Sequence, residues 1–335
     1  MVSIKRVLLP QPIEKEAISL LEATNFEIVL APDRRPETIA PLLKGVQAVI
    51  LRTGIIFSRE LMNHGDDLWV ISRTGAGVDN VDVPAATEMG ILVTCIPGAN
   101  TNSVIEHALA LIFALAKHLP LMDREVRKDH FDIRFKNLPR DLRGKTLGVI
   151  GLGRIGSDLA RICYQAFGMS ILGHDPYLTS EAKAVFQGWV EFCDMERLFR
   201  ESDVISIHIP LLPGTQKLIG AREFGWMKAD AFLINTSRGG VLDEEALIQY
   251  LRGKRIAGAG LDVFAQEPLE KDNPLKELDN VILTPHTAAL TRECVIRLAM
   301  EATKAIIDVL HGKRPEGMVN PEVLTQPRWQ GFLKG

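Results

Sequence analysis

Three glycines stand directly after an apolar run and before a helical pattern, in an arrangement suited to binding phosphate. The run is Thr146–Ile150, the glycines are Gly151, Gly153 and Gly156, and the helical pattern covers Ser157–Phe167. The first glycine permits a tight turn, the second lets the backbone approach a pyrophosphate, and the third allows the helix to pack closely on the strand. A pyrophosphate there lies against the free N–H groups of the helix N-terminus, where the helix dipole favours anions. The spacing therefore predicts a dinucleotide-binding loop.

An acidic residue at the end of the next apolar run refines this prediction. Asp175 closes that run, with 18 residues between it and Gly156. A carboxylate at this distance accepts hydrogen bonds from the adenosine ribose hydroxyls and repels a 2′-phosphate. Pro176 and Tyr177 follow, and neither supplies the positive charge that a 2′-phosphate needs. We therefore expect NAD rather than NADP as the cofactor.

An arginine, a glutamate and a histidine follow three apolar runs further downstream. Arg238 lies in the segment TSRGG, Glu267 in LDVFAQEP and His286 in TPH. Because ligands of open α/β sheets bind outside the carboxyl ends of the strands, we expect the three side chains to converge near the nicotinamide end of the cofactor. A guanidinium can hold a carboxylate with two hydrogen bonds, and an imidazolium oriented by a carboxylate can protonate a developing alkoxide. The set predicts hydride transfer involving a 2-oxo acid.

Six apolar runs in the second half of the chain predict the strands of one doubly wound domain. They alternate with helical patterns, which is typical of a parallel sheet covered on both faces. The runs are Thr146–Ile150, Ser170–Gly173, Val204–Ile209, Ala231–Asn235, Ala257–Val263 and Val281–Thr284. A last helical pattern, Thr291–Leu310, follows them and ends at a His-Gly pair that fits a helix C-cap.

The first hundred residues show a second alternation, without a glycine-rich phosphate loop. The predicted strands are Val7–Leu9, Phe26–Leu30, Ala48–Leu51, Trp69–Ser72 and Ile91–Thr94. The predicted helices are Ile13–Ala23, Pro36–Lys44, Arg59–Asn63 and Val83–Met89. A long helix then runs from Asn102 towards Lys117, stops at His118-Leu-Pro and is followed by a charged arm. The pattern predicts two α/β domains with a boundary near residues 100–104.

Composition and charge exclude several classes of protein. The 335 residues are 46% hydrophobic and 24% charged, which is ordinary for a globular chain. With 39 basic and 42 acidic residues, the chain has no positive excess to bind nucleic acid. The longest uncharged apolar run, Ala108–Ala116, has nine residues and is too short for a membrane span. The N-terminus lacks the features of an export signal, and the four scattered cysteines predict neither disulfides nor a metal site. We expect a cytoplasmic protein.

The motifs above resemble those of the D-isomer-specific 2-hydroxyacid dehydrogenases, from about Val46 to Asn320. That family includes D-3-phosphoglycerate dehydrogenases, hydroxypyruvate and glyoxylate reductases and D-lactate dehydrogenases. The resemblance implies that Arg238 binds and polarises the substrate, that His286 is the general acid and base, and that Glu267 is the partner of the histidine.

The resemblance also implies which residues surround the cofactor. Asp262 is expected at the nicotinamide carboxamide, and His208–Pro210 with Thr215 along the adenosine and ribose. The full set of implied NAD contacts is Gly151, Gly153, Arg154, Ile155, Gly156, Asp175, His208, Ile209, Pro210, Thr215, Thr236, Ser237, Arg238, Asp262, His286 and Ala288.

The family's topology is one that periodicity alone does not give. The resemblance implies two doubly wound Rossmann-like domains: a NAD-binding domain, residues 102–290, inserted into a discontinuous flavodoxin-like substrate domain, residues 1–101 and 291–335. The helix at 104–116 and the charged arm after it resemble the family's dimerisation elements, so a homodimer is expected. A plain buried helix explains the apolar run equally well.

The substrate is the least determined part of the expectation. The implied substrate contacts are Arg52, Thr53, Gly75, Ala76, Gly77, Asn100 and Arg238. Backbone N–H groups at the Gly75–Gly77 turn form an anion nest. A phosphorylated substrate needs a further cation, for which Arg52 and Arg73 are candidates, although Gly54 and Ile56 stand where some phosphoglycerate enzymes carry basic residues. The sequence favours a D-3-phosphoglycerate dehydrogenase-like function and leaves a hydroxypyruvate or glyoxylate reductase open.

Two alternatives from other classes use the same fold. A non-catalytic NAD-sensing binding protein predicts extra interaction segments, which we do not find, and a structural platform leaves Arg238, Glu267 and His286 without a role. Formate dehydrogenases pair their histidine with an amide, which Glu267 disfavours. We also expect no regulatory domain after the region of Pro321. An enzyme is the favoured interpretation.

Overall fold

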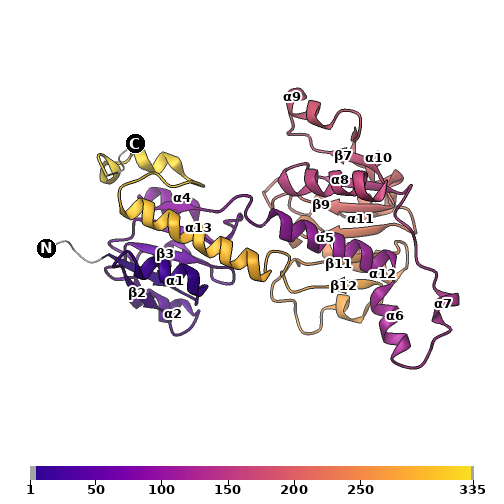
Figure 1. Ribbon diagram of the computed structural model, residues 1–335, viewed down its shortest axis with the longest axis horizontal. Coiled ribbons are helices and arrows are strands. Elements are labelled where there is room, and N and C mark those ends of the chain that lie inside the picture. Colours follow the sequence, from indigo (N-terminus) through magenta and orange to yellow (C-terminus); the bar gives the residue numbers. More distant parts are fainter. Residues whose placement is uncertain (1–4, 333–335) are drawn as a thin grey trace. The chain divides into compact units, whose positions relative to one another are not determined.

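The computed structural model describes residues 5–332 (Figure 1). These residues divide into two compact units. The first runs to Asn100 and resumes at Leu290, and the second is Thr101–Ala289. Each unit contains a parallel sheet, so the α/β fold class expected from the sequence is confirmed.

The sheet of the first unit has the strand order β2-β1-β3-β4-β5, and all its pairings are parallel. This is the flavodoxin-like order, with a topological switch point between β1 and β3. β3 and β4 are buried along their whole length. β3 is apolar on both faces, as is typical of a parallel sheet that is covered on both sides, whereas β4 ends in the buried polar residues Ser72 and Arg73. The strands are β1 Arg6–Leu9, β2 Glu27–Leu30, β3 Ala48–Leu51, β4 Val70–Arg73 and β5 Leu92–Thr94.

Helices cover both faces of this sheet. α1 (Lys15–Glu22) and α13 (Arg292–Leu310) pack together, and α13 also lies against β3 and β4. The final long helix thus returns to the sheet built by the first hundred residues, which makes this unit discontinuous. The other face carries α2 Pro36–Ile39, α3 Arg59–Met62 and α4 Val83–Glu88, with the 3-10 helices η1 Ala40–Leu43, η5 Pro321–Thr325 and η6 Pro327–Trp329 in the same unit.

The sheet of the second unit has the order β12-β11-β10-β9-β6-β7-β8, again with parallel pairings. Its switch point lies between β6 and β9. The strands are β6 Thr146–Ile150, β7 Ser170–His174, β8 Glu191–Phe192, β9 Val204–Ile207, β10 Phe232–Asn235, β11 Gly258–Leu261 and β12 Val281–Leu283. Edge strand β8 was not expected, because its two residues form no apolar run.

Two helix layers enclose this second sheet. α5 (Thr101–Ala116) and α8 (Arg154–Phe167) share one apolar core, whereas α10 (Met195–Glu201), α11 (Ala221–Trp226) and α12 (Glu244–Arg252) share the other. The remaining helices of the unit are α6 Leu119–Val126, α7 Ile133–Lys136, α9 Ser180–Lys183, η2 Ala184–Phe186, η3 Gly239–Val241 and η4 Pro274–Glu277. Both layers leave the carboxyl ends of the strands accessible to loops.

The segment after α5 differs from the sequence expectation. His118 has a φ of +52°, which ends α5 where the stop was predicted, but α6 begins at the next residue. The charged arm thus contains two helices, α6 and α7, because a left-handed residue redirects the chain without preventing a new helix. No single helix among residues 5–332 has the length and apolarity to cross a membrane. α5 and α6, bent by 57° at their junction, meet that test only as a pair.

Candidate active site

The glycine loop joins β6 to α8, and its first and third glycines are required by close packing. Gly151 has a φ of +87°, and a Cβ there would lie 2.5 Å from the carbonyl oxygen of His208. A Cβ at Gly156 would overlap the carbonyl oxygen of Gly151. At Gly153 an added Cβ would meet no atom of residues 5–332 within 4 Å. Space is thus left at the glycine where a pyrophosphate must approach the backbone. Arg154 and Ile155 form the first turn of α8 beside it.

Asp175 lies directly beyond the end of β7 and is held against this loop. One carboxylate oxygen accepts the N–H of Leu152 at 2.9 Å, and the other accepts the N–H of Tyr177 at 3.1 Å. Each oxygen has a further lone pair, so the fixed carboxylate can still accept from a ribose hydroxyl.

The end of β9 forms the neighbouring edge of the loop. His208 places its carbonyl against Gly151, and a methyl group of Ile209 lies there too. Desolvation lowers the pKa of His208 to about 4, so the imidazole is neutral near pH 7, and its Nε2 shares a hydrogen bond of 2.8 Å with Ser206. Thr215 closes the following turn, since its hydroxyl donates to the carbonyl of Pro210 at 2.7 Å.

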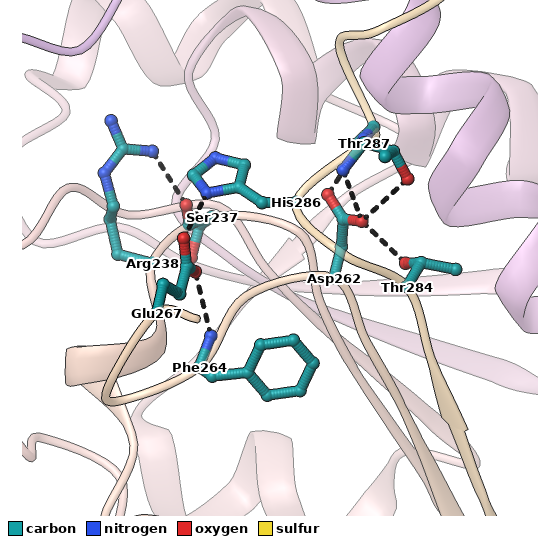
Figure 2. Close-up of polar contacts among 9 residues, drawn as sticks. Ser237, Arg238, Asp262, Phe264, Glu267, Thr284, His286 and Thr287 are labelled. Carbon is teal, nitrogen blue, oxygen red and sulfur yellow. Dashed lines mark hydrogen bonds and ion pairs between the residues drawn. The ribbon is translucent and has the colours of Figure 1, made fainter. Parts of the chain in front are cut away.

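His286 and Glu267 form a hydrogen-bonded pair beyond the ends of β12 and β11. Nδ1 of His286 lies 2.7 Å from Oε2 of Glu267, and Oε1 of Glu267 accepts the N–H of Phe264 at 3.1 Å. Figure 2 shows Arg238 beside this pair, with its Nη1 donating to the carbonyl of Ser237 at 2.8 Å. The structure thus brings together the three side chains that the sequence singled out.

The charges in this group fix the proton on His286. Burial raises the pKa of Glu267, but the hydrogen bond and charge of His286, the Phe264 N–H and the charge of Arg238 together bring that pKa below its ordinary value. An ionised carboxylate only accepts hydrogen bonds, so Nδ1 of His286 must carry the hydrogen between them. The other ring nitrogen, Nε2, is then the atom that can exchange a proton with a ligand. The two side chains are 37% and 35% exposed, so this nitrogen can be reached.

Asp262 organises the segment that carries His286. Its side chain is fully buried, and its oxygens accept the Thr284 hydroxyl at 2.6 Å and the N–H groups of Thr287 and Ala288 at 2.9 Å each (Figure 2). Its backbone carbonyl accepts the N–H of His286 at 2.8 Å. The expected contact of Asp262 with the nicotinamide carboxamide stays a prediction, because the structure gives this carboxylate a role inside the loop.

Asn235, which the sequence reasoning did not single out, shapes the turn that carries Arg238. This buried residue ends β10, and its side-chain oxygen accepts both the N–H and the hydroxyl of Ser237, while its amide donates to the carbonyl of Arg238. The available signal was a polar side chain at the end of an otherwise apolar strand. The sequence reasoning also did not predict that Thr284 and Thr287 donate hydrogen bonds to Asp262, because nothing near them in the sequence indicates that partner.

One buried hydroxyl supports a bound cofactor at these strand ends. Oγ1 of Thr236 is buried and has no hydrogen-bond partner among residues 5–332. Buried polar groups are rarely left unpaired, so an absent ligand group is a fitting partner. With the open space at Gly153 and the exposed Arg154 at the start of α8, the residues present fit a dinucleotide. No three His, Cys, Asp or Glu side chains in the described part of the chain gather as a metal site would require.

The expected substrate residues of the first unit lie at the ends of its strands. Arg52, after β3, donates through Nη1 to Glu14 at 3.0 Å and to the carbonyl of Pro12 at 3.2 Å. The carbonyl of the adjacent Thr53 accepts from Gln11 at 2.8 Å. Arg52 thus already has an acidic partner, which lies in the segment between β1 and α1.

The glycine turn after β4 lies over the side chain of Arg73. Gly75 is buried over the guanidinium of Arg73, which also donates to Asn80 and to the carbonyl of Thr74. Ala76 is exposed and Gly77 is half-buried. Asn100 is the last residue before the chain enters the second unit. The buried side chain of Arg73 therefore supports the turn from beneath, and the binding of an anion by the turn's backbone stays a prediction.

Comparison with known proteins identifies the family. The sequence model described as "D-isomer specific 2-hydroxyacid dehydrogenase, NAD binding domain" matches residues 109–288. The chain is 38% identical to the D-3-phosphoglycerate dehydrogenase of Archaeoglobus fulgidus over 94% of its own length and 59% of that protein. It is 36% identical to the glyoxylate reductase of Korarchaeum cryptofilum, covering 95% of this chain and 97% of that one.

Among solved structures, the chain is similar to D-lactate dehydrogenase from Aquifex aeolicus complexed with NAD and lactic acid. The TM-score is 0.83 at 30% identity, over 92% of this chain and 96% of the other. The chain belongs to the D-isomer specific 2-hydroxyacid dehydrogenase family, and residues 109–288 are its NAD-binding domain. It spans about three fifths of the length of the D-3-phosphoglycerate dehydrogenases that it matches.

Proposed function

We propose that the chain is an NAD-dependent D-2-hydroxyacid dehydrogenase of the D-3-phosphoglycerate dehydrogenase type, acting on a small D-2-hydroxy or 2-oxo acid. One observation carries the proposal: the His286–Glu267 hydrogen bond, with Arg238 beside it, at the carboxyl ends of the sheet that also carries the glycine loop. A protein that only senses NAD needs the loop but not this acid–base group.

The reaction uses two contributions, one from the cofactor and one from the chain. When bound, the nicotinamide supplies or accepts the hydride at the substrate carbon. In the direction of reduction, Nε2 of His286 gives a proton to the carbonyl oxygen as it becomes a hydroxyl, and in oxidation it removes that proton. Glu267 stabilises the charged imidazolium and keeps the hydrogen on Nδ1.

Arg238 supplies the electrostatic part of the proposed mechanism. Its guanidinium offers paired donors that match a carboxylate, and its positive charge stabilises negative charge developing on the carbonyl oxygen. The Ser237 carbonyl accepts from Nη1 of the guanidinium, and the amide of Asn235 holds the backbone carbonyl of Arg238. Arg238 therefore orients the 2-oxo acid while His286 exchanges the proton.

A specific contact favours the second candidate, a hydroxypyruvate or glyoxylate reductase. The salt bridge between Arg52 and Glu14 balances the positive charge that a substrate phosphate would need. An unphosphorylated 2-oxo acid requires no such charge. The chain is similar both to a D-3-phosphoglycerate dehydrogenase and to a glyoxylate reductase, so both substrates stay candidates.

A panel of 2-oxo acids tests the proposal. Rates of NADH and NADPH oxidation are measured with 3-phosphohydroxypyruvate, hydroxypyruvate, glyoxylate and pyruvate. We expect NADH-dependent reduction, with the highest kcat/KM for the phosphorylated acid. Preference for hydroxypyruvate or glyoxylate would replace the first candidate by the second. NADH binding without turnover of any acid would favour the NAD-sensing protein instead.

A homodimer formed through the arm, residues 119–138 with α6 and α7, is part of the proposal. The arm exposes apolar side chains in a short stretch, and Arg134 lies over the rings of Phe131 and Phe135. Clusters of this kind mark interaction surfaces. The exposed residues are Leu119, Val126, Phe131, Phe135 and Leu138.

Sedimentation tests the dimer. Phe135→Ser should shift the protein towards monomer, whereas Val185→Ser, at an equally exposed apolar position outside the arm, should not. If both variants remain dimers, the arm does not form the dimer interface. The cytoplasmic location stays a prediction from the sequence, as does the absence of nucleic-acid and membrane partners.

A further inference from the structure

His107 of α5 reaches the loop that carries His286, although 179 positions in the sequence separate the two histidines. Nε2 of His107 lies 2.9 Å from the hydroxyl of Thr284 and 3.5 Å from Oδ1 of Asp262. The side chain of His107 is 21% exposed, and that of Asp262 is fully buried. The contact therefore connects a helix on the face of the sheet to a buried carboxylate beyond the strand ends.

The direction of these hydrogen bonds follows from the groups involved. The Thr284 hydroxyl has one hydrogen, and at 2.6 Å from Oδ1 of Asp262 it donates that hydrogen to the carboxylate. The hydroxyl oxygen can then only accept from His107, so Nε2 of His107 carries a hydrogen. Two consecutive hydrogen bonds through the Thr284 hydroxyl thus link His107 of α5 to Asp262.

Asp262 in turn holds the backbone of His286 and of the two residues that follow it. Its side chain accepts the N–H groups of Thr287 and Ala288, and its carbonyl accepts that of His286. His286 has a φ of +53°, a conformation that residues other than glycine adopt only when their surroundings hold them. The position of its imidazole against Glu267, at 2.7 Å, depends on that backbone.

We propose that His107 is a positioning residue for His286, acting through Thr284 and Asp262. Its hydrogen bond to the Thr284 hydroxyl fixes that hydroxyl as a donor to the buried carboxylate, and the satisfied carboxylate keeps residues 284–288 in the conformation that points His286 at Glu267. The proposal rests on the proposed dehydrogenase function, since it concerns the acid–base residue of that reaction. His107 itself touches neither substrate nor cofactor in this account.

Two substitutions of His107 separate positioning from general loss of structure. His107→Gln places an amide N–H close to the position of Nε2 and should retain the bond to Thr284. His107→Asn is shorter and cannot reach it. We expect His107→Asn to lower kcat by about 10- to 100-fold, since small misplacement of a catalytic group has effects of this size. His107→Gln should stay within about threefold of the unmutated protein, and the KM of the 2-oxo acid and the Kd of NADH should change little in both.

A second pair of variants breaks the same path from its other end. Thr284→Val removes the hydroxyl at nearly constant volume, and Thr284→Ser restores it. We expect Thr284→Val to reproduce the loss in kcat and Thr284→Ser to recover most of it. In the double variant His107→Asn with Thr284→Val, the losses should not multiply, because both act through one path. Glu106→Gln, at an exposed neighbouring position of α5, serves as the control for changes in the helix.

Hydrogen exchange supplies a readout that does not depend on turnover. In His107→Asn, the amides of Thr287 and Ala288 should exchange faster, while those of β6 and α8 keep their rates. Unchanged exchange and a kcat within twofold of the unmutated protein would overturn the positioning role, as would equal impairment of His107→Gln and His107→Asn. If the unmutated protein reduces no 2-oxo acid, the proposed function fails, and the exchange rates alone decide whether His107 holds the loop.

Discussion

The charged side chains beyond the strand ends of the two units have different bonding partners. In the second unit, Glu267 is held by His286 and by the Phe264 N–H, and the charge of Arg238 favours its ionised form. In the first unit, Arg52 is bonded to Glu14, a residue of the segment before α1. The acid–base group thus leaves a reactive nitrogen accessible, whereas the cation expected to bind substrate is already paired. In the proposed function the chemistry comes from the second unit, and we expect the preference for a phosphorylated substrate to depend on how strongly Glu14 holds Arg52.

Replacing Arg238 gives the largest effect that bears on this comparison. We expect Arg238→Ala to lower kcat/KM for the 2-oxo acid by about 10²- to 10³-fold, the usual loss when one electrostatic stabiliser of a transition state is removed. Titration of NADH fluorescence should give a Kd within about threefold of the unmutated protein. Arg238→Lys should recover only part of the loss, because an ammonium cannot donate two parallel hydrogen bonds. Full activity of Arg238→Ala would remove Arg238 from the mechanism, and full activity of Arg238→Lys would show that its charge alone suffices.

Replacing Asp175 gives an intermediate effect that concerns the cofactor alone. Asp175→Ala should lower the preference for NADH over NADPH by about tenfold, as expected for loss of charge-assisted hydrogen bonds and of repulsion towards a 2′-phosphate. The ratio of kcat/KM values for the two cofactors measures it. Asp175→Asn keeps an acceptor for the Leu152 N–H and so separates the charge from the shape of the loop. Equal rates with NADH and NADPH in the unmutated protein would contradict the assignment.

Releasing Arg52 from its partner gives the smallest effect and addresses the first unit directly. Glu14→Gln should raise kcat/KM for 3-phosphohydroxypyruvate by about two- to fivefold, the range of partly exposed ion pairs, and leave glyoxylate unchanged. Arg52→Gln should act in the opposite direction on the phosphorylated acid only. If both variants change the two substrates equally, Arg52 is a structural residue of the first unit and not a phosphate ligand.

Most of the strands were predictable because they lie in apolar runs of the sequence. β3 and β6 have the predicted bounds, and β1, β2, β4 and β5 begin or end one residue away from them. β8 and the helices of the charged arm were missed, since a two-residue edge strand and exposed polar helices lack an apolar pattern. The fold class needs only the alternation of elements, which the sequence displays.

The site was predictable where a residue type follows the end of a strand. Arg238, Glu267 and His286 were selected on that ground, and the structure groups them. Asn235 was not selected, and Asp262 was expected only at the nicotinamide, because the side chains of both hold backbone atoms that only the folded chain brings near. The pairing of Arg52 with Glu14 likewise joins residues 38 positions apart, and no local pattern indicates it.

The role of His286 is the claim on which the whole account depends, and a single variant measures it. For His286→Ala, the rate of NADH oxidation with the preferred 2-oxo acid and the Kd of NADH are determined together. Loss of the proton donor should lower kcat by about 10²- to 10⁴-fold while NADH still binds as in the unmutated protein. Turnover at the unmutated rate with normal NADH binding would contradict the assignment of His286 as the acid and base.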